Sequence, residues 1–326
     1  MKRTACLTAA VLLVSLCEFS LPGALAQPAY PAKTVRIVVP AAPGGGTDIL
    51  ARVLAQKLSE TLDQQFVVEN RPGAGQIIGT ESVARAAPDG YTLLMGASPI
   101  ATNQVLYKKI PYDTLRDFAP IALCATVPNL LVVHPSLPVK SVREFIALAK
   151  ARPEQITYAS AGAGTSPHLS MELLRAMAAI KFVHIPYKGT GPATIDVIAG
   201  QVQSMSMNVL TALTHVKAGK LRALGVTSSR RAAVLPEVPT IAEAGVPGYE
   251  AISWYGLLAP AGTPRRVIDK IHAETARALQ LPDVREKLAA DGAEASVNRP
   301  EEFTAYIRAE IAKWGKLVRD GGITAE

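Results

Sequence analysis

The chain has 326 residues, 49% of them hydrophobic, and a formal net charge of +7. A basic chain can bind nucleic acid, but here the basic residues are scattered, aromatic residues make up only 5%, and no aromatic ladder lies between the basic pairs. We therefore expect solvated basic faces and no nucleic-acid partner.

The N-terminus has the pattern of a secretory signal peptide. A basic start leads into an apolar stretch at residues 5–16, and Ala24-Leu25-Ala26 is a small-x-small cleavage site. These features predict a signal peptide over residues 1–26, cleavage after Ala26 and a location in the periplasm. Cys17 suggests a lipoprotein as an alternative, but the leucine before it stands where a small residue is expected. A soluble exported product is therefore favoured.

The predicted mature chain retains one cysteine, Cys124, so an internal disulfide is excluded. Burial alone must then hold about 300 residues, which exceeds one typical core and favours two domains. No segment after the signal peptide reaches the roughly 18 uncharged apolar residues of a transmembrane helix.

Strand patterns and helix patterns alternate along nearly the whole chain. Apolar and β-branched runs predict strands at residues 35–40, 66–69, 91–95, 129–134, 156–160, 182–186, 202–207, 221–227 and 253–258. Ser141 and Glu144 form a capping box, and Ser166 before Pro167 predicts another helix start. This alternation predicts an α/β chain with mostly parallel sheets.

The first predicted strand leads through Gly44–Gly46 into a helix with an apolar face, and Thr47 or Asp48 can cap that helix. The first-turn N–H groups of a helix have no intrahelical partner, so a carboxylate or phosphate is stabilised there without a lysine. A P-loop is excluded because Thr47-Asp48 stands where Lys-Ser/Thr is required.

The segment Gly73–Gly79 also follows a strand and opens a helix, which raises the question of a dinucleotide site. Arg71-Pro72 separates the strand from the glycines by more than a tight turn, and Asp89 lies in a turn instead of ending a second strand. We expect a structural loop here and no cofactor.

Ligands of α/β sheets bind where strands end and helices begin. Four loops occupy that position: residues 41–48, 96–103, 160–168 and 187–192. The first and third are rich in glycine and hydroxyl groups and are separated by about 120 residues, which suggests a ligand held between two domains.

Seven segments resemble one known family in sequence and in order. They are residues 30–40 (YPAKTVRIVVP), 43–48 (PGGGTD), 68–75 (VENRPGAG), 88–93 (PDGYTL), 185–189 (IPYKG), 239–245 (PTIAEAG) and 254–260 (WYGLLAP). The chain is similar, from Tyr30 almost to the C-terminus, to the Bug family of periplasmic solute receptors of tripartite tricarboxylate transporters.

The resemblance implies a two-domain periplasmic binding protein of type II, with the ligand cleft between the domains. It implies one domain from residues 30–126 plus 254–326, a second from 127–253, and two crossovers near 125–130 and 250–254. The implied ligand is a small organic carboxylate. The implied partners of a monomeric receptor are membrane transporter subunits or, in a signalling role, a sensor kinase.

In this family the loop matching residues 41–48 holds one ligand carboxylate, partly through ordered waters, and the loop matching 160–168 holds the rest. With the helix-terminus argument, this predicts a site of Ala42, Gly44, Gly45, Thr47, Asp48, Ser98, Ser160, Ala161, Gly164, Thr165, Ser166, His168, Tyr187, Met207, Asn208 and Trp254. Two positions depart from the family: Ala41 replaces an aromatic residue, and Met207 stands where an acid is often found. Because a methionine gives an ammonium group only a weak acceptor, we expect carboxylates without an amino group.

Several of these residues also fit a purely structural role. Asp48 fits a helix cap as well as a ligand contact, and His168 fits local packing as well as orientation of the loop. Tyr187 and Trp254 fit either the cleft wall or a domain core, and Met207 fits a core position.

Enzymatic and metal-binding functions lack their usual signatures. The histidines lack metal-ligand spacing, and Ser160 lacks the first glycine of a Gly-x-Ser-x-Gly elbow because Tyr158 occupies that position. We therefore expect a receptor and not an enzyme. Transport and signalling both remain open at this stage.

Overall fold

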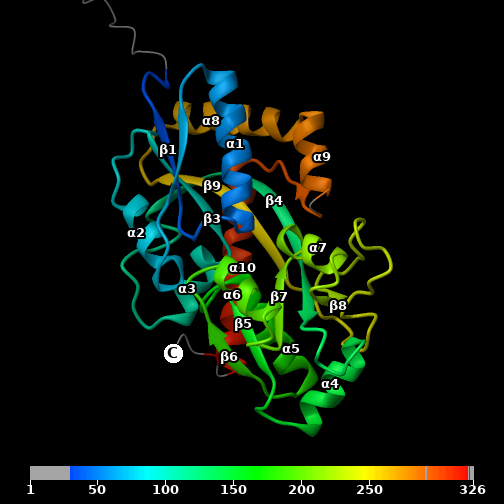
Figure 1. Ribbon diagram of the computed structural model, residues 1–326. Helices are drawn as coiled ribbons and strands as arrows, with labels where there is room; N and C mark the ends of the chain where they lie inside the picture. Colours follow the sequence, from blue (N-terminus) through cyan, green and yellow to red (C-terminus); the bar gives the residue numbers. More distant parts are fainter. Residues whose placement is uncertain (1–29, 291, 322, 324–326) are drawn as a thin grey trace, which may run out of the picture. The chain divides into compact units, whose positions relative to one another are not determined.

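The protein is described by a computed structural model that covers residues 30–290, 292–321 and 323. The predicted signal peptide and its cleavage site lie outside the described residues. In chain order the elements are β1 (Val35–Val39), α1 (Gly46–Leu62), β2 (Phe66–Asn70), the short 3-10 helix η1 (Ala74–Gln76), α2 (Ile77–Ala84), β3 (Thr92–Ala97), α3 (Pro99–Leu106), β4 (Phe118–Val133), α4 (Val142–Ala151), β5 (Thr157–Ser160), α5 (Ser166–Ala178), β6 (Val183–Pro186), α6 (Thr190–Ile198), β7 (Ser204–Asn208), α7 (Val209–Lys217), β8 (Arg222–Val226), β9 (Ile252–Pro260), α8 (Arg265–Gln280), α9 (Pro282–Ala290), β10 (Glu294–Ala295) and α10 (Pro300–Gly321) (Figure 1).

The strands are hydrogen-bonded in the order β2-β1-β3-β9-β4-β7-β5-β6, and β8 and β10 pair with β4. Strand β1 is parallel to β2 and β3, and β5 is parallel to β6 and β7. Every antiparallel pair among the described strands involves β4 or β9. The expected parallel pairing therefore holds within β1–β3 and within β5–β7, and the complete sheet is mixed.

Strand β4 changes its partners part of the way along its length. Residues 118–128 pair with β9, whereas residues 129–133 pair with β7 and β8. Figure 1 shows β4 and β9 side by side where they link the two groups of parallel strands. The predicted strand at 129–134 is only the second half of β4, because Pro120 and Pro128 interrupt the strand pattern of the first half.

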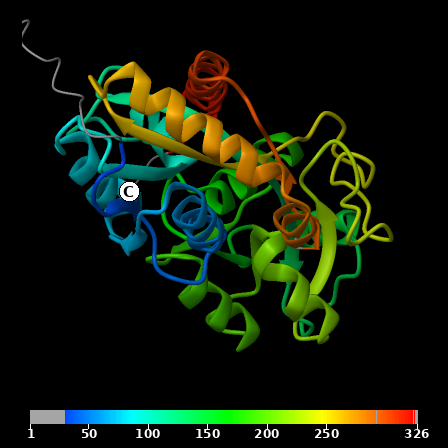
Figure 2. The ribbon, with the colours of Figure 1, turned by 90° about the horizontal axis from the view of Figure 1, so that it is seen from above.

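The predicted apolar face of α1 and the helix start at Ser141 are confirmed, whereas the N-cap of α1 is Gly45 and not Thr47 or Asp48. Leu50, Val53, Leu54 and Leu58 of α1 are all buried, and α1 packs against α8 (Figure 2). The Ser141 Oγ atom accepts the N–H of Glu144 at 3.2 Å, as the capping box requires. The expected cap at Ser166 is wrong by one residue, since Thr165 is the N-cap and Ser166 begins α5. Among the described residues, no helix has the length and apolar character needed to cross a membrane.

Helix α10 joins two apolar clusters. Phe303 packs with Trp254 in one cluster, and Trp314 belongs to another that includes Leu131 and Phe145. Between them, one carboxylate oxygen of Glu310 accepts the indole N–H of Trp254 at 3.1 Å and that of Trp314 at 2.9 Å. Trp254 is fully buried. A single acid thus satisfies two indole groups in a dry environment.

We expect Glu310→Ala to lower the free energy of unfolding by about 2–4 kcal/mol, because two buried N–H donors lose their acceptor. Glu310→Gln retains an acceptor oxygen and should have a smaller effect. Urea unfolding followed by circular dichroism measures the change, with Glu286→Ala on the exposed side of α9 as the control. Equal unfolding midpoints for Glu310→Ala and Glu286→Ala would contradict the proposed role of Glu310.

Candidate functional site

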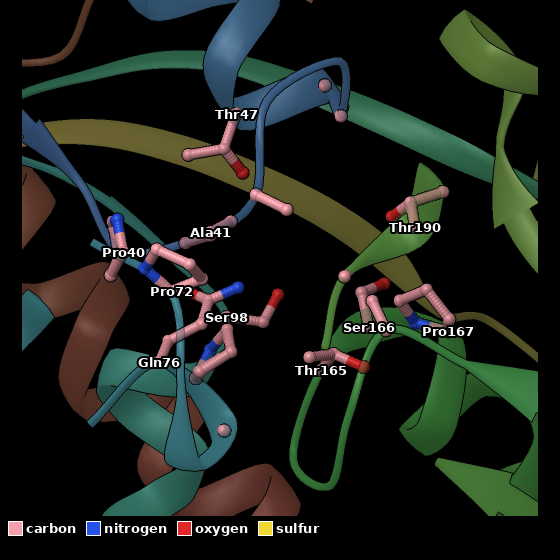
Figure 3. Close-up of a pocket in the computed structure, with 18 of the residues that line it drawn as sticks. Pro40, Ala41, Thr47, Pro72, Gln76, Ser98, Thr165, Ser166, Pro167 and Thr190 are labelled. Atoms are coloured by element: carbon pink, nitrogen blue, oxygen red, sulfur yellow. The ribbon is translucent and has the colours of Figure 1, made fainter. Parts of the chain in front are cut away.

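A pocket lies at the carboxyl ends of the strands, where the loops leading into the helices converge. It encloses about 730 Å³ of space, part of it open solvent. Its walls come from the loops after β1, β2, β3, β5 and β6 and from the facing ends of β7 and β9. Figure 3 shows Ala41, Gln76 and Ser98 on one side and Thr165, Ser166 and Thr190 on the other.

Helix ends, with a single lysine, are the main source of positive charge around the pocket. Helices α1, α3, α5 and α6 all begin at lining residues, and none of their N-cap residues makes a side-chain capping bond. Lys188 is the only charged residue in the described lining, which contains no aspartate or glutamate. Because helix N-termini carry positive partial charge, this arrangement favours an anion.

Ten of the sixteen predicted site residues line this pocket: Ala42, Gly45, Thr47, Ser98, Ala161, Thr165, Ser166, Tyr187, Asn208 and Trp254. The remaining six do not: Gly44, Asp48, Ser160, Gly164, His168 and Met207. Five of these six lie in the same loops as the lining residues or at their ends, and Met207 lies on β7.

Asp48 stabilises the conformation of the loop at residues 41–48. Its carboxylate accepts the N–H of Gly44 at 3.0 Å, Nε of Arg52 at 3.0 Å and Nδ2 of Asn70 at 2.9 Å. Burial acts to raise the pKa of Asp48, but the bonds from Arg52, Gly44 and Asn70 together lower it below its usual value. The hydrogen bonds of the Asp48 carboxylate therefore hold the loop in its conformation. The carboxylate neither caps α1 nor lines the pocket.

Met207 is a correction to the predicted site. Its side chain is fully buried in an apolar cluster with Met205 and Val209. Since side chains alternate along a strand, the next residue on β7, Asn208, faces the pocket instead. Trp254 fits both of its proposed roles in part, because it borders the pocket while its ring lies in the core.

The hydroxyl groups of Thr165 and Ser166, in the loop at residues 160–168, differ in the hydrogen bonds that they already make. Thr165 donates its hydroxyl proton to the carbonyl of Gly162 at 2.6 Å and is only 2% exposed. Ser166 is half-buried, and its oxygen accepts an N–H of Asn129 at 2.7 Å, so its proton remains available. Ser166 is therefore the better hydrogen-bond donor toward a ligand.

Some lining residues were not predicted from the sequence. Residues 72–76 form one wall although the sequence indicated only a structural loop, and Ser253 and Tyr255 border the pocket from β9. Gly75 and Gln76 have positive φ angles of 61° and 74°, and the glycines of this loop were the available signal. Gly189 has a φ of 136°, and a Cβ there would lie 3.0 Å from the Cβ of Ala42.

A stack of histidines supports the third loop from behind. His168 accepts the N–H of Gly164 at 3.1 Å, and Nε2 of His184 lies 2.7 Å from Oγ of Ser160. The two imidazole rings stack at 4.3 Å, and the ring of Tyr158 covers His184 at 4.8 Å. His168 thus orients the loop, which is one of the two roles expected from the sequence.

Burial lowers the pKa of His168 to about 4 and that of His184 to about 3; Arg175 adds to the effect on His168, and His168 adds to that on His184. Both rings are therefore neutral at neutral pH. Ser160 is fully buried and does not line the pocket, so its contact with His184 is not a catalytic pair. Among the described residues, no three His, Cys, Asp or Glu side chains form a group that could hold a metal ion.

Acid should destabilise the protein through this stack. The pKa values in the folded chain lie below the ordinary value of 6.5, so below pH 6.5 the unfolded chain binds protons that the folded chain does not. The contribution of the two histidines to the free energy of unfolding is fully present above pH 6.5. It falls by roughly 1.4 kcal/mol per pH unit for each histidine as the pH drops toward 4. His184→Phe, which keeps a ring but removes the titrating group, should flatten this dependence in urea titrations at pH 7.5, 6 and 5. An unchanged pH dependence in the variant would count against the stack as its source.

Comparison with known proteins identifies the family of this chain. The model of the tripartite tricarboxylate transporter family receptors, TctC, matches residues 50–323. BugT of Bordetella pertussis is 42% identical over 297 residues, covering 90% of this chain and 90% of BugT. The structure is similar to that of Rpa4515 of R. palustris with adipate, with a TM-score of 0.88, 39% identity and coverage of 90% and 99% of the two chains.

It is also similar to MatC of Rhodopseudomonas palustris with bound malate, with a TM-score of 0.83, 36% identity and coverage of 89% and 100%. These matches confirm the two-domain periplasmic binding-protein fold with its cleft and a receptor instead of an enzyme. The chain belongs to the TctC family of periplasmic solute receptors, in agreement with its resemblance to the Bug proteins.

Proposed function

We propose that this receptor binds a small dicarboxylate in the pocket and delivers it to the membrane subunits of a tripartite tricarboxylate-type transporter. The observation that carries this proposal is a pocket with four uncapped helix N-termini and no acidic lining residue. Adipate and malate, present in the structures of two similar proteins, are both dicarboxylates, which supports the same ligand class here.

The proposed mechanism is capture between two domains. The first comprises residues 30–126 and 254–326, and the second comprises residues 127–253. The change of partners in β4 at residues 128–129 supports the first boundary. We further propose export by a signal peptide cleaved after Ala26 and action as a monomer.

Each end of a dicarboxylate has a counterpart in this pocket. We propose that Ala42, Gly45 and Thr47 at the start of α1 hold one carboxylate, in part through water. Ala161, Thr165 and Ser166 at the start of α5 hold the other. Ser98, Tyr187, Asn208 and Trp254 complete the predicted contacts.

The same lining disfavours a ligand with an ammonium group. Desolvating a cation is costly unless a negatively charged group faces it, and the lining contains no aspartate or glutamate. Asp48 is bonded to Arg52 and Asn70, and Asp196 accepts the hydroxyl of Tyr187 at 2.6 Å. Neither of these acids belongs to the lining. Met207 has no part in this preference, because it does not line the pocket.

Calorimetric titration of the purified protein tests the ligand class. Adipate, succinate and malate should bind more tightly than aspartate and glutamate. At 100 times its dissociation constant, a ligand should also stabilise the protein by about 2.7 kcal/mol. Tighter binding of aspartate than of succinate would contradict the argument from charge, and an absence of binding to all five would contradict the proposed function.

Gly45 offers a steric test of the pocket. Its φ of −86° suits any residue, and a Cβ would lie 3.8 Å from Oγ1 of Thr190, an ordinary contact. Gly45→Ala should therefore leave the affinity within about twofold of the wild type. Gly45→Val adds two methyl groups toward Thr190 and should weaken adipate binding about tenfold or more, as expected for overpacking of 1–3 kcal/mol. Equal affinities for the two variants would argue against ligand binding between Gly45 and Thr190.

A further inference from the structure

A cluster of buried polar side chains lies partly in the wall of the pocket and partly behind it. Asn129 of β4, Ser170 of α5, Asn208 of β7, and Ser253 and Tyr255 of β9 are each at most 7% exposed. Buried polar groups are costly unless they are hydrogen-bonded, so the bonds within this cluster decide what it does.

The amide of Asn129 is at the centre of this cluster and is fully hydrogen-bonded. Its Oδ1 accepts from Nδ2 of Asn208 at 2.7 Å and from Oγ of Ser253 at 3.1 Å. Its Nδ2 donates to Oγ of Ser166 at 2.7 Å and to Oγ of Ser170 at 2.9 Å. These four bonds use the whole capacity of an amide side chain.

Asn129 also lies where β4 changes partners. The preceding residues pair with β9, whereas Asn129 is opposite Asn208 of β7. Its main-chain N–H donates to Oγ1 of Thr227 at 2.8 Å, and its carbonyl accepts the N–H of Thr227 at 2.9 Å. The side chain is therefore held on a fixed piece of main chain and cannot follow Ser166 if that residue moves.

The bond to Ser166 has a direction that matters for binding. Since Ser166 accepts the N–H of Asn129, its own proton is free to be donated, and Ser166 lines the pocket. Ser170 accepts from the same amide but does not line the pocket. Of the two bonds that Nδ2 of Asn129 donates, one thus reaches the site and one does not. The two bonds that its Oδ1 accepts come from Asn208 and Ser253, which also line the pocket.

We propose that Asn129 is a positioning residue that holds Ser166 as a hydrogen-bond donor toward the ligand and so selects a ligand group with acceptor oxygens. The proposal rests on the proposed function, since it assigns the preference for a carboxylate to a residue that the ligand does not touch. It also ties the ligand to the segment of β4 that joins the two groups of strands.

A double-mutant cycle tests the proposal with adipate as the probe. Ser166→Ala and Asn129→Ala should each weaken calorimetric affinity about tenfold, which corresponds to one hydrogen bond of about 1.4 kcal/mol. If Asn129 acts through Ser166, the double variant should bind about as weakly as Ser166→Ala alone. An effect of Asn129 that does not act through Ser166, whether purely structural or through Asn208 and Ser253, would instead give additive losses, about a hundredfold in the double variant.

Ser170→Ala is the matched control because it removes another bond of the same amide without altering the pocket lining. It should lower the melting temperature and leave the affinity for adipate within about twofold of the wild type. Asn129→Ser, which keeps a short polar group, replaces Asn129→Ala if that variant does not fold. Additive losses, or a full loss of affinity in Ser170→Ala, would overturn the role of Asn129 while adipate binding by the wild type upholds the proposed function. Failure of the wild type to bind any dicarboxylate would overturn both.

Discussion

The fold depends on the change of partners within β4. The same strand pairs with β9 through residues 118–128 and with β7 and β8 through residues 129–133. One continuous main chain therefore supplies hydrogen bonds to both groups of parallel strands. Because parallel strands deliver their connecting loops to one edge of a sheet, this joint brings two sets of loops together at the pocket.

The features of the pocket that favour an anion are largely helix ends and not charged side chains. Helix N-termini provide fixed partial charges and N–H groups that are already oriented, and a single lysine is present in the lining. A receptor must release its ligand as well as bind it, and main-chain donors with hydroxyls hold a carboxylate less tightly than a buried arginine pair would. The lack of acidic lining residues would leave an ammonium group without a partner, which supports the proposed preference for ligands that lack one.

Buried polar groups behind the pocket determine the shape of its walls. Asp48 fixes the first loop through Gly44 and Arg52, and His168 fixes the third through Gly164. The amide of Asn129 connects the start of α5 to β7 and β9. In a dry interior each of these groups is costly if unpaired, so the loops are held in one arrangement before any ligand enters.

Local patterns determined much of the fold. The apolar face of α1, the capping box at Ser141 and most strands follow from residue spacing, because periodicity and capping act over a few neighbouring residues. The glycine loops likewise identified the edge of the sheet where the pocket lies. The first half of β4 was missed since its prolines break the pattern that a strand usually has.

Contacts between distant residues were decided by the tertiary structure alone. The sequence could not tell that Met207 faces the core and Asn208 the pocket, since a shift of one residue in a strand exchanges the two faces. Nor could it reveal the bonds of Asn129, whose partners Ser166, Asn208 and Ser253 lie 37, 79 and 124 residues away. The sequence by itself indicated most of the loops that line the pocket, though not residues 72–76, and indicated that helix N-termini there suit an anion. Only the packing of β4 against β7 and β9 decided which side chains of those loops face the pocket and which ones hold them in place.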